Sequence, residues 1–326
     1  MCRLHETETQ SWRNLVMIIL ILKLSKGHYG AHFEALDALN SIIEFSKQEI
    51  PLSATFSDAF VRKYFPTIFA STEAPNAANC LDKVFKNYEL KKHINVKCDE
   101  TDGLDTCSGL TFVSHDDKAI VIAFRGTKGK LQLLVESDEI MYRNKTAWFG
   151  GGNVGYYFAH AFNLIWNDGM KADLNLLIHK YPNYEIWVGG HSLGGSMAAL
   201  ASNFLISTGL ATSSNLKMIT FGEPRTGDKD FADTHDSLVP YSYRIIHKKD
   251  IVPHIPLNGM EGFHHHRNEI WYDNEMETAD FKECDAQESP FCSDSHLDFM
   301  ISDHHRYYGM FMSFYGRRNC TGDPAN

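Results

Sequence analysis

The sequence predicts an α/β fold: one domain with a mostly parallel central sheet and helices on both faces. Segments with strand character alternate with helical patterns beyond residue 119, and this alternation favours a parallel sheet. Residues 119–124 are apolar throughout, as is typical of a strand buried on both faces. Residues 184–200 have the pattern of a strand, a sharp turn and a helix rich in small residues. We find no internal repeat or interdomain linker, so one domain is the simplest interpretation.

The N-terminal residues 1–30 are predicted to be a secretory signal peptide. Their apolar core, 14–24, follows two arginines and is too short to span a bilayer as a helix. Two acidic residues and one lysine weaken the pattern, so a membrane anchor or a wrongly assigned start remains an alternative. Residues 31–53 are expected to be a partly helical extension, and residues 54–326 to form the main domain.

The cysteines and two glycosylation sequons agree with secretion, and the net charge argues against a nucleic-acid partner. Removal of the leader would take one of the seven cysteines and leave six, which in an oxidising compartment suggests three disulfides. Two glycosylation sequons begin at Asn144 and Asn319. The net charge of −10 argues against nucleic-acid binding, because phosphate contacts need a concentrated basic face. The sequence therefore predicts an extracellular or lumenal protein with no nucleic-acid partner.

The remaining elements follow from apolar periodicity and turn signals. Helical patterns cover 56–69 and 156–180, the second interrupted at Gly169 and ended by Pro182. Further strands are expected at 110–114 (in a hairpin with 119–124), 216–221, 241–246 and 268–272, the last one being the final strand. A closing helix is expected in or beside 307–314.

The turn after the strand 185–189 carries the motif Gly190-His-Ser-Leu-Gly194. A turn this tight strains its central residue, and residues without a Cβ are needed on both sides of it. The hydroxyl of Ser192 would then stand clear of the sheet. The pattern alone is also compatible with a glycine-rich turn that carries an idle serine.

A serine hydroxyl needs a base in contact and an acid that orients the base. Asp250 follows the strand 241–246 at the carboxyl end of the sheet, where sites of open parallel sheets gather, and Asp228 is the alternative acid. His304 or His305 is the candidate base. The run His264–His266 could suggest a metal, but three adjacent residues cannot all face one ion, and a metal site is not favoured.

Taken together, the motifs resemble those of a fungal-type (class 3) secreted lipase of the α/β-hydrolase superfamily. The resemblance covers about residues 56–321. It implies a single domain with a lid, Ser192 as the nucleophile, Asp250 as the orienting acid and His304, rather than His305, as the base. The matching pieces are Phe124-Arg-Gly-Thr127, Gly190-His-Ser-Leu-Gly-Gly195, Phe221-Gly-Glu-Pro-Arg225, Asp250-Ile-Val-Pro253, Glu269-Ile-Trp-Tyr272 and Asp303-His304 ahead of Tyr-Tyr-Gly.

The same resemblance implies an oxyanion hole made by the backbone N–H groups of Thr127 and Leu193, and no metal or organic cofactor. It places a lid just after Thr127, where an amphipathic flap would present four apolar side chains: Leu131, Leu133, Leu134 and Val135. A buried irregular segment is the alternative for this stretch. The disulfide pairs implied are Cys98–Cys107, Cys284–Cys292 and Cys80–Cys320. The lid lacks the tryptophan of well-known fungal members, and the His264–His266 loop is unlike theirs.

We therefore expect a secreted serine ester hydrolase that cleaves acyl esters of lipids, with triacylglycerols as the leading substrate class. Its substrate would be met at an oil–water or membrane surface, without an obligate protein partner. A phospholipase A1 and a carboxylesterase for soluble esters are the alternatives among enzymes. A catalytically silent lipid-binding or storage protein with the same fold is the alternative of a different class.

Overall fold

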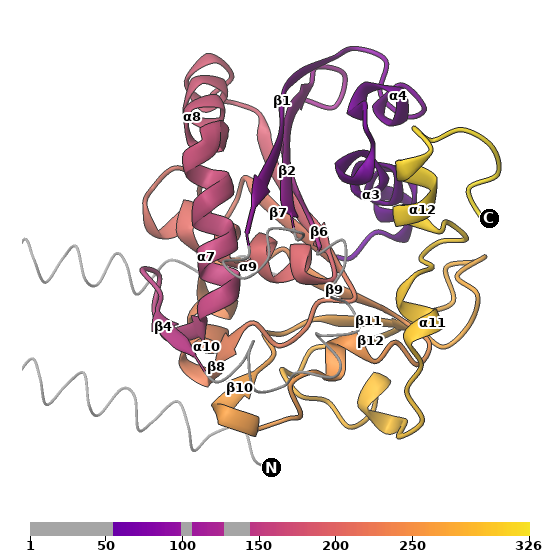
Figure 1. The fold of residues 1–326 in the computed structure, drawn as a ribbon. Coiled ribbons are helices and arrows are strands. Elements are labelled where there is room, and N and C mark those ends of the chain that lie inside the picture. Colours follow the sequence, from indigo (N-terminus) through magenta and orange to yellow (C-terminus); the bar gives the residue numbers. More distant parts are fainter. Residues whose placement is uncertain (1–54, 99–105, 127–143) are drawn as a thin grey trace, which may run out of the picture. The chain divides into compact units, whose positions relative to one another are not determined.

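A mixed eight-stranded sheet runs through the fold in the computed structural model (Figure 1). The structure describes residues 55–98, 106–126 and 144–326, which belong to one unit from Ser53 to Asn326. The predicted signal peptide, 1–30, and the predicted extension, 31–53, lie outside the described residues. Among the described residues, no helix is long and apolar enough to span a bilayer.

The strands of the large sheet lie in the order β1-β2-β3-β6-β7-β9-β11-β12. The five from β3 to β11 are mutually parallel, and the outer strands at both edges are antiparallel to their neighbours. This confirms the predicted mostly parallel sheet. The bounds are β1 Tyr88–Lys97, β2 Thr106–Ser114, β3 Ala119–Arg125, β6 Glu185–His191, β7 Leu216–Phe221, β9 Ser242–His247, β11 Glu269–Tyr272 and β12 Lys282–Cys284.

Helices cover both faces of this sheet, with α7 and α8 on one side and α3 and α12 on the other (Figure 1). A second, small sheet has the order β10-β8-β5-β4. The helices are α3 Asp58–Glu73, α4 Ala77–Leu81, α7 Tyr156–Ile165, α8 Lys171–Lys180, α9 Leu193–Ser207, α10 Lys229–Leu238, α11 Ile301–His304 and α12 Met312–Arg317, and the small strands are β4 Lys145–Ala147, β5 Asn153–Gly155, β8 Gly227–Asp228 and β10 Phe263–His264.

The apolar strand β3 explains why both faces need helices. Ile120, Ile122 and Phe124 pack into the core shared with α7, α8 and α9. The alternate residues Val121 and Ala123 pack into the aromatic-rich core beneath α3. Because successive strand side chains point to opposite faces, an apolar run of this kind can be buried only between two layers.

The predicted helical pattern 156–180 is broken as expected. The chain leaves regular α-helix at Trp166–Met170, where Gly169 has φ +126°, and α8 then resumes and ends before Pro182. The hairpin of β2 and β3 is also confirmed.

The structure departs from the expected strands in two details. The strand β11 is not the last, because β12 follows it and pairs with it through Glu269 and Cys284. The edge strand β1 was not predicted. The closing helix expected in or beside 307–314 is confirmed as α12, which begins at Met312, and Tyr307 and Met310 form an isolated bridge just before it.

The six cysteines form three disulfides with the pairing that the resemblance implies: Cys80–Cys320, Cys98–Cys107 and Cys284–Cys292. The first joins positions 240 residues apart and links α4 to the C-terminal segment. It therefore holds together two segments, distant in the chain, that pack against each other.

Candidate active site

The turn between β6 and α9 holds Ser192 in a backbone conformation that residues with a side chain rarely adopt, with φ +60° and ψ −133°. Its N–H donates to the carbonyl of Phe221 at the end of the neighbouring strand β7, at 2.9 Å. Strain of this kind persists only where the surrounding structure enforces it, and it is typical of functional sites. The turn therefore has the geometry of a nucleophile elbow.

The two glycines of the motif are required by close backbone contacts. A Cβ at Gly190 would lie 2.0 Å from the carbonyl oxygen of Gly194, and a Cβ at Gly194 would lie 2.2 Å from that of Phe124. These distances are far below a van der Waals contact. A larger residue at either position would push the helix α9 away from the ends of β3 and β6.

Asp250 and His304 form a fully buried pair. The Nδ1–H of His304 donates to both carboxylate oxygens of Asp250, at 2.8 and 3.0 Å, and both side chains are completely shielded from solvent. Asp250 comes from the turn after β9, and His304 ends the one-turn helix α11. Gly222 makes room for this pair, since a Cβ there would lie 2.6 Å from Asp250 Oδ2 and 2.7 Å from His304 Nδ1.

Two further groups hold the carboxylate of Asp250. The hydroxyl of Tyr307 donates to Oδ2 at 2.6 Å, and the N–H of Val252 donates to Oδ1 at 2.9 Å. Burial by itself would raise the pKa of Asp250, but the charge and hydrogen bonds of His304 and the bonds from Tyr307 and Val252 outweigh it and hold this pKa below its ordinary value. The carboxylate is therefore ionised at neutral pH.

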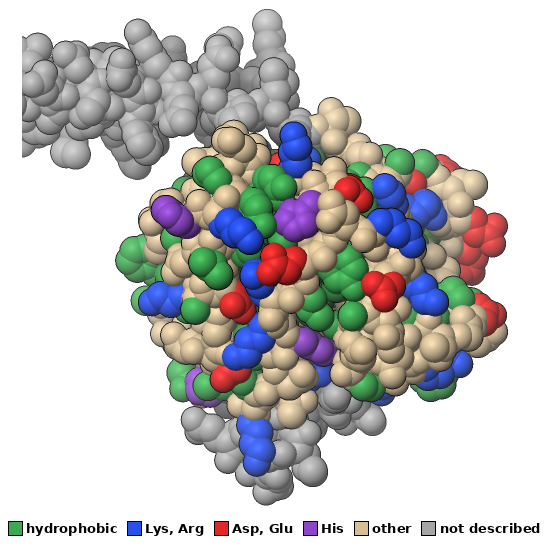
Figure 2. Space-filling model, turned by 90° about the horizontal axis from the view of Figure 1, so that it is seen from above, with side chains coloured by type: hydrophobic (Ala, Val, Ile, Leu, Met, Phe, Trp, Pro, Cys, Tyr) green, Lys and Arg blue, Asp and Glu red, His purple; other side chains and the backbone are tan. Residues whose placement is uncertain are grey.

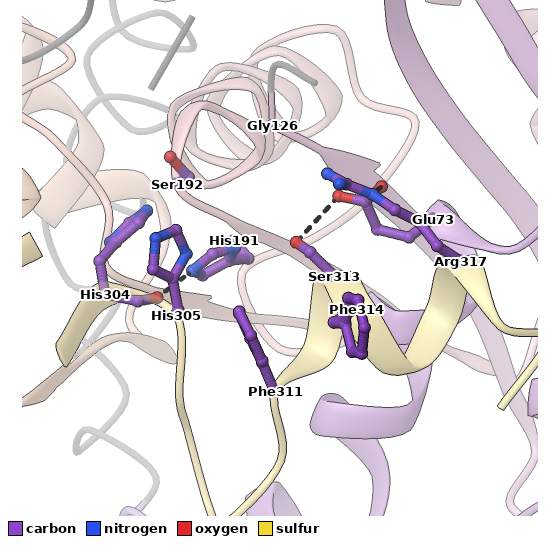
Figure 3. Close-up of a pocket in the computed structure, with 10 residues that line it drawn as sticks. All are labelled: Glu73, Gly126, His191, Ser192, His304, His305, Phe311, Ser313, Phe314 and Arg317. Atoms are coloured by element: carbon purple, nitrogen blue, oxygen red, sulfur yellow. Dashed lines mark hydrogen bonds and ion pairs between the residues drawn. The ribbon is translucent and has the colours of Figure 1, made fainter. Parts of the chain in front are cut away.

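A cavity of about 230 Å³ is lined by Ser192 and His304 (Figure 3). Ser192, His191 and His304 lie on one side of it, and Glu73 and Arg317 lie on the other. Within the described part of the chain, Nε2 of His304 has no hydrogen-bond partner, although it is buried. With Nδ1 occupied by Asp250, the free Nε2 is the atom that can exchange a proton with a group in the cavity.

His191, the residue before Ser192, contacts His304 in two ways. Its Nε2–H donates to the main-chain carbonyl of His304 at 2.8 Å, and the two rings are stacked with centroids 4.4 Å apart. Burial, followed by the neighbouring His304, lowers the pKa of His191 to about 3. His191 is therefore neutral at physiological pH.

Backbone N–H groups are available beside Ser192. Leu193 opens α9, and the first N–H groups of a helix have no acceptor within the helix. Gly126 lies against this turn, because a Cβ there would be 3.1 Å from Ser192 Cβ and 3.5 Å from the nitrogen of Leu193. Thr127 and the predicted lid residues Leu131, Leu133, Leu134 and Val135 lie outside the described residues.

The alternative acid and base have other surroundings. Asp228 is the N-cap of α10 and accepts from the N–H of Phe231, which gives it a structural role. His305 lines the cavity beside His304, edge to face, without a bond to Asp250 among the contacts described. The structure thus joins His304, and not His305, to the buried carboxylate.

The adjacent histidines 264–266 point to separate partners. His264 lies 3.8 Å from the carboxylate of Glu288. His265 Nε2 donates to the carbonyl of Pro253 at 2.6 Å, and His266 Nε2 lies 3.2 Å from the buried carboxylate of Glu223. Across residues 55–98, 106–126 and 144–326, no cluster of histidine, cysteine and acidic side chains has the geometry to hold a metal.

The motif Phe221–Arg225 supports the site without touching the cavity. Glu223 accepts from the hydroxyls of Thr220 and Thr226, and the buried Arg225 is paired with Glu288 at 2.7 Å. These bonds stabilise the loop after β7, which passes Asp250 and His304 at Gly222.

Two residues of the site, Tyr307 and His191, were not singled out by the sequence. The sequence did carry a signal for each, because Tyr307 follows the candidate base within one helical turn and His191 precedes the nucleophile. Their partners lie 57 and 113 residues away in the chain. Such partners cannot be identified from local spacing.

The surface features bear on the remaining predictions. Asn144 is exposed, whereas the side-chain oxygen of Asn319 accepts from the N–H of Asn76 at 2.9 Å. Glycosylation at both positions stays a prediction.

Figure 2 shows one face of the molecule, where Lys and Arg side chains are interspersed with Asp and Glu side chains. On that face the charges do not form the basic stripe that nucleic-acid binding needs.

Comparison with known proteins agrees with this geometry. The model of the family "Lipase (class 3)" matches residues 121–260. Lipase ZK262.3 of Caenorhabditis elegans is 31% identical over 309 residues, a match that covers 84% of this chain and 85% of the relative. The lipase of Rhizomucor miehei is 33% identical over 230 residues, covering 66% and 61% of the two chains.

Solved lipase structures share the fold. The lipase from Rhizopus microsporus var. chinensis matches with a TM-score of 0.68 and 26% identity, covering 84% of this chain and 96% of that one. The triacylglyceride lipase of Rhizomucor miehei matches with a TM-score of 0.68 and 25% identity, covering 82% and 98%. The chain therefore belongs to the class 3 lipase family and is a serine ester hydrolase with the α/β-hydrolase fold.

Proposed function

We propose that this lipase cleaves the acyl esters of lipids, with triacylglycerols as the leading substrate class, through an acyl-serine intermediate on Ser192. Asp250 and His304 complete the catalytic triad in this proposal. The single observation that carries it is the bond from His304 Nδ1 to the buried carboxylate of Asp250, which leaves Nε2 free beside a strained serine turn.

In the first half-reaction, the Oγ of Ser192 attacks the carbonyl carbon of the ester while Nε2 of His304 takes the hydroxyl proton. The carbonyl oxygen becomes an oxyanion. When the tetrahedral intermediate collapses, the bond to the alcohol breaks and His304 returns the proton to the departing alcohol. The ionised Asp250 stabilises the imidazolium form of His304 that exists between these two steps.

In the second half-reaction, water replaces the alcohol. His304 removes a proton from the water, whose oxygen attacks the acyl carbon, and collapse of the second intermediate returns the proton to Ser192 and releases the fatty acid. Besides the ester and water, these steps use side chains and backbone groups of the chain itself.

The proposed oxyanion hole consists of the N–H groups of Leu193 and Thr127. The support for Leu193 is its position at the N-terminus of α9, directly after the nucleophile. The support for Thr127 is the close approach of its neighbour Gly126 to Ser192 and Leu193. The loss of one such donor costs about 2.7–4 kcal/mol of transition-state stabilisation.

Further proposals concern the bounds of the domain and two segments outside the described residues. We propose residues 54–326 as the hydrolase domain, a lid around Leu131, Leu133, Leu134 and Val135, and secretion directed by residues 1–30. The relative from Penicillium cyclopium is named a secreted mono- and diacylglycerol lipase A, and it is 28% identical over 186 residues. This relative supports secretion, as do the three disulfides.

A fluorophosphonate probe tests the triad. The wild-type protein should be labelled and inactivated, and Ser192→Ala should lose labelling while it keeps its melting temperature. His304→Ala should be labelled far more slowly, because the hydroxyl would lack its base. Wild-type protein that neither reacts with the probe nor hydrolyses any ester would identify a silent lipid-binding protein instead.

The substrate class is tested by parallel hydrolysis of emulsified triolein, phosphatidylcholine vesicles and a dissolved butyrate ester. We expect triolein emulsions to be cleaved with the highest kcat. Preference for phosphatidylcholine would indicate a phospholipase A1, and preference for the dissolved ester would indicate a carboxylesterase. Either result would overturn the triacylglycerol assignment and leave the triad in place.

A further inference from the structure

His191 connects the nucleophile turn with the catalytic base. It is the last residue of β6, and Ser192 follows it directly. Its Nε2 lies 2.8 Å from the main-chain oxygen of His304, and since a carbonyl can only accept, Nε2 of His191 carries the hydrogen. The ring of His191 also lies nearly parallel to that of His304, at an interplanar angle of 26°.

The base needs such a contact because its own element is weak. The helix α11 has only four residues, and a helix of one turn leaves most of its backbone groups unpaired. Three bonds hold the residues before His304: from Met300 N–H to the carbonyl of Lys249 at 2.7 Å, from Lys249 N–H to Oδ2 of Asp303 at 3.2 Å, and from His247 Nδ1 to the carbonyl of Asp303 at 3.1 Å. The carbonyl of His304 itself is held by His191.

His191 is neutral, which suits a residue stacked on a histidine that becomes positively charged during the reaction. Burial, followed by the neighbouring imidazoles of His304 and His305, lowers its pKa, and the hydrogen bond to the carbonyl of His304 and the charge of Asp250 only partly oppose this shift. His191 therefore keeps its Nε2–H and adds no second positive charge when His304 becomes an imidazolium. The stacked ring stays a neutral surface throughout the reaction.

We propose that His191 is a positioning residue for the base: its Nε2–H holds the main chain of His304, and its ring holds the plane of the His304 ring against the nucleophile turn. This inference rests on the proposed triad of Ser192, Asp250 and His304. A side chain adjacent to the nucleophile would thus fix the position of the base relative to it, although 113 residues separate His191 from His304.

The test compares three variants by kcat and KM on a dissolved butyrate ester. His191→Ala removes both contacts and is expected to lower kcat about tenfold to a hundredfold, the usual cost of a misplaced catalytic group. His191→Phe keeps a flat ring and loses the donor, so it should retain an intermediate kcat. KM should stay within about twofold of the wild type in both variants, because both contacts are made with His304 and neither is made with the substrate.

The matched control is His235→Ala. His235 is likewise a neutral histidine beside a second histidine: it is buried, its ring is tilted against that of His266 at 4.2 Å, its Nε2 is bonded to Ser242 at 3.0 Å, and it does not line the catalytic cavity. This variant should have a lower melting temperature than the wild type and the same kcat. The proposal is overturned if His191→Ala keeps the wild-type kcat, or if its kcat falls no more than that of His235→Ala. The wild type must react with the fluorophosphonate in the same series, and its failure to react would refute the triad itself.

Discussion

The hydroxyl of Tyr307 gives the sharpest test of how the acid is held. Tyr307 is fully buried and stacked on Phe221 with ring centroids 4.9 Å apart, so Tyr307→Phe should remove the hydroxyl and leave the packing unchanged. Asp250 Oδ2 would lose a bond of 2.6 Å and keep its bond from His304. A hydrogen bond to a charged group contributes about 1.5–3 kcal/mol, which corresponds to about one to two pKa units.

The expected direction follows from the carboxylate. The bond from Tyr307 lowers the pKa of Asp250, so its loss raises that pKa. A carboxylate whose pKa is lower in the folded protein than in the unfolded chain stabilises the fold at pH values above its pKa in the unfolded chain. This contribution is lost as the pH falls through its pKa in the folded protein. Tyr307→Phe should therefore melt at a lower temperature at pH 7, and its unfolding on acidification should begin at a higher pH. We expect kcat to fall less than about tenfold, since both bonds between His304 and Asp250 remain.

The assay is thermal unfolding by circular dichroism from pH 3 to pH 8, together with kcat at pH 7. Tyr272→Phe is the matched control, because the buried hydroxyl of Tyr272 also donates to a carboxylate, that of Asp58, away from the cavity. The control should have a lower melting temperature than the wild type and an unchanged kcat. The reasoning is refuted if Tyr307→Phe is as stable as the wild type at pH 7, or if both proteins unfold at the same acidic pH.

Three further substitutions test other features of the site. Ser192→Gly should abolish hydrolysis and raise the melting temperature, because the φ of +60° costs a residue with a side chain about 1 kcal/mol or more; an unchanged or lower melting temperature would show that the turn is not strained. Gly194→Ala should reduce both activity and stability, since its Cβ would lie 2.2 Å from the carbonyl of Phe124, and wild-type values would contradict this. The double change Cys80→Ala, Cys320→Ala should lower the free energy of unfolding by up to about 5 kcal/mol in a denaturant titration with kcat retained at 25 °C, and equal stability would refute the prediction.

Much of the fold was predictable because its determinants are local. The apolar run of β3, the glycines around Ser192, and Gly169 inside the long helical pattern each act through residues close in sequence, and each is found as expected. The turn after β9 that carries Asp250 follows from the same reasoning, since its place at the carboxyl end of a parallel strand depends on the strand alone.

The remaining features depend on partners that are distant in the chain. Most residues of the edge strand β1 are partly buried, only Ile94 is fully buried, and a register shift between Leu90 and Lys92 interrupts the strand; it exists because it pairs with β2. The strand β12 has three residues and is defined by its pairing with β11 and the disulfide of Cys284. The choice of His304 over His305 likewise depended on family spacing, because two adjacent histidines cannot be separated by local pattern.

The position of His304, the proposed base, follows from contacts around α11 rather than from the C-terminal helix. His304 is held by Asp250 at its Nδ1 and by His191 at its carbonyl, and Lys249 holds the residue before α11. The disulfide of Cys320 and the packing of α12 on α3 act farther along the chain. Because the two sets of contacts share no bond, loss of the disulfide should reduce stability without moving the base, whereas loss of His191 should move the base at little cost in stability. Loss of the disulfide should therefore lower the stability and keep kcat, whereas His191→Ala should lower kcat and largely keep the stability.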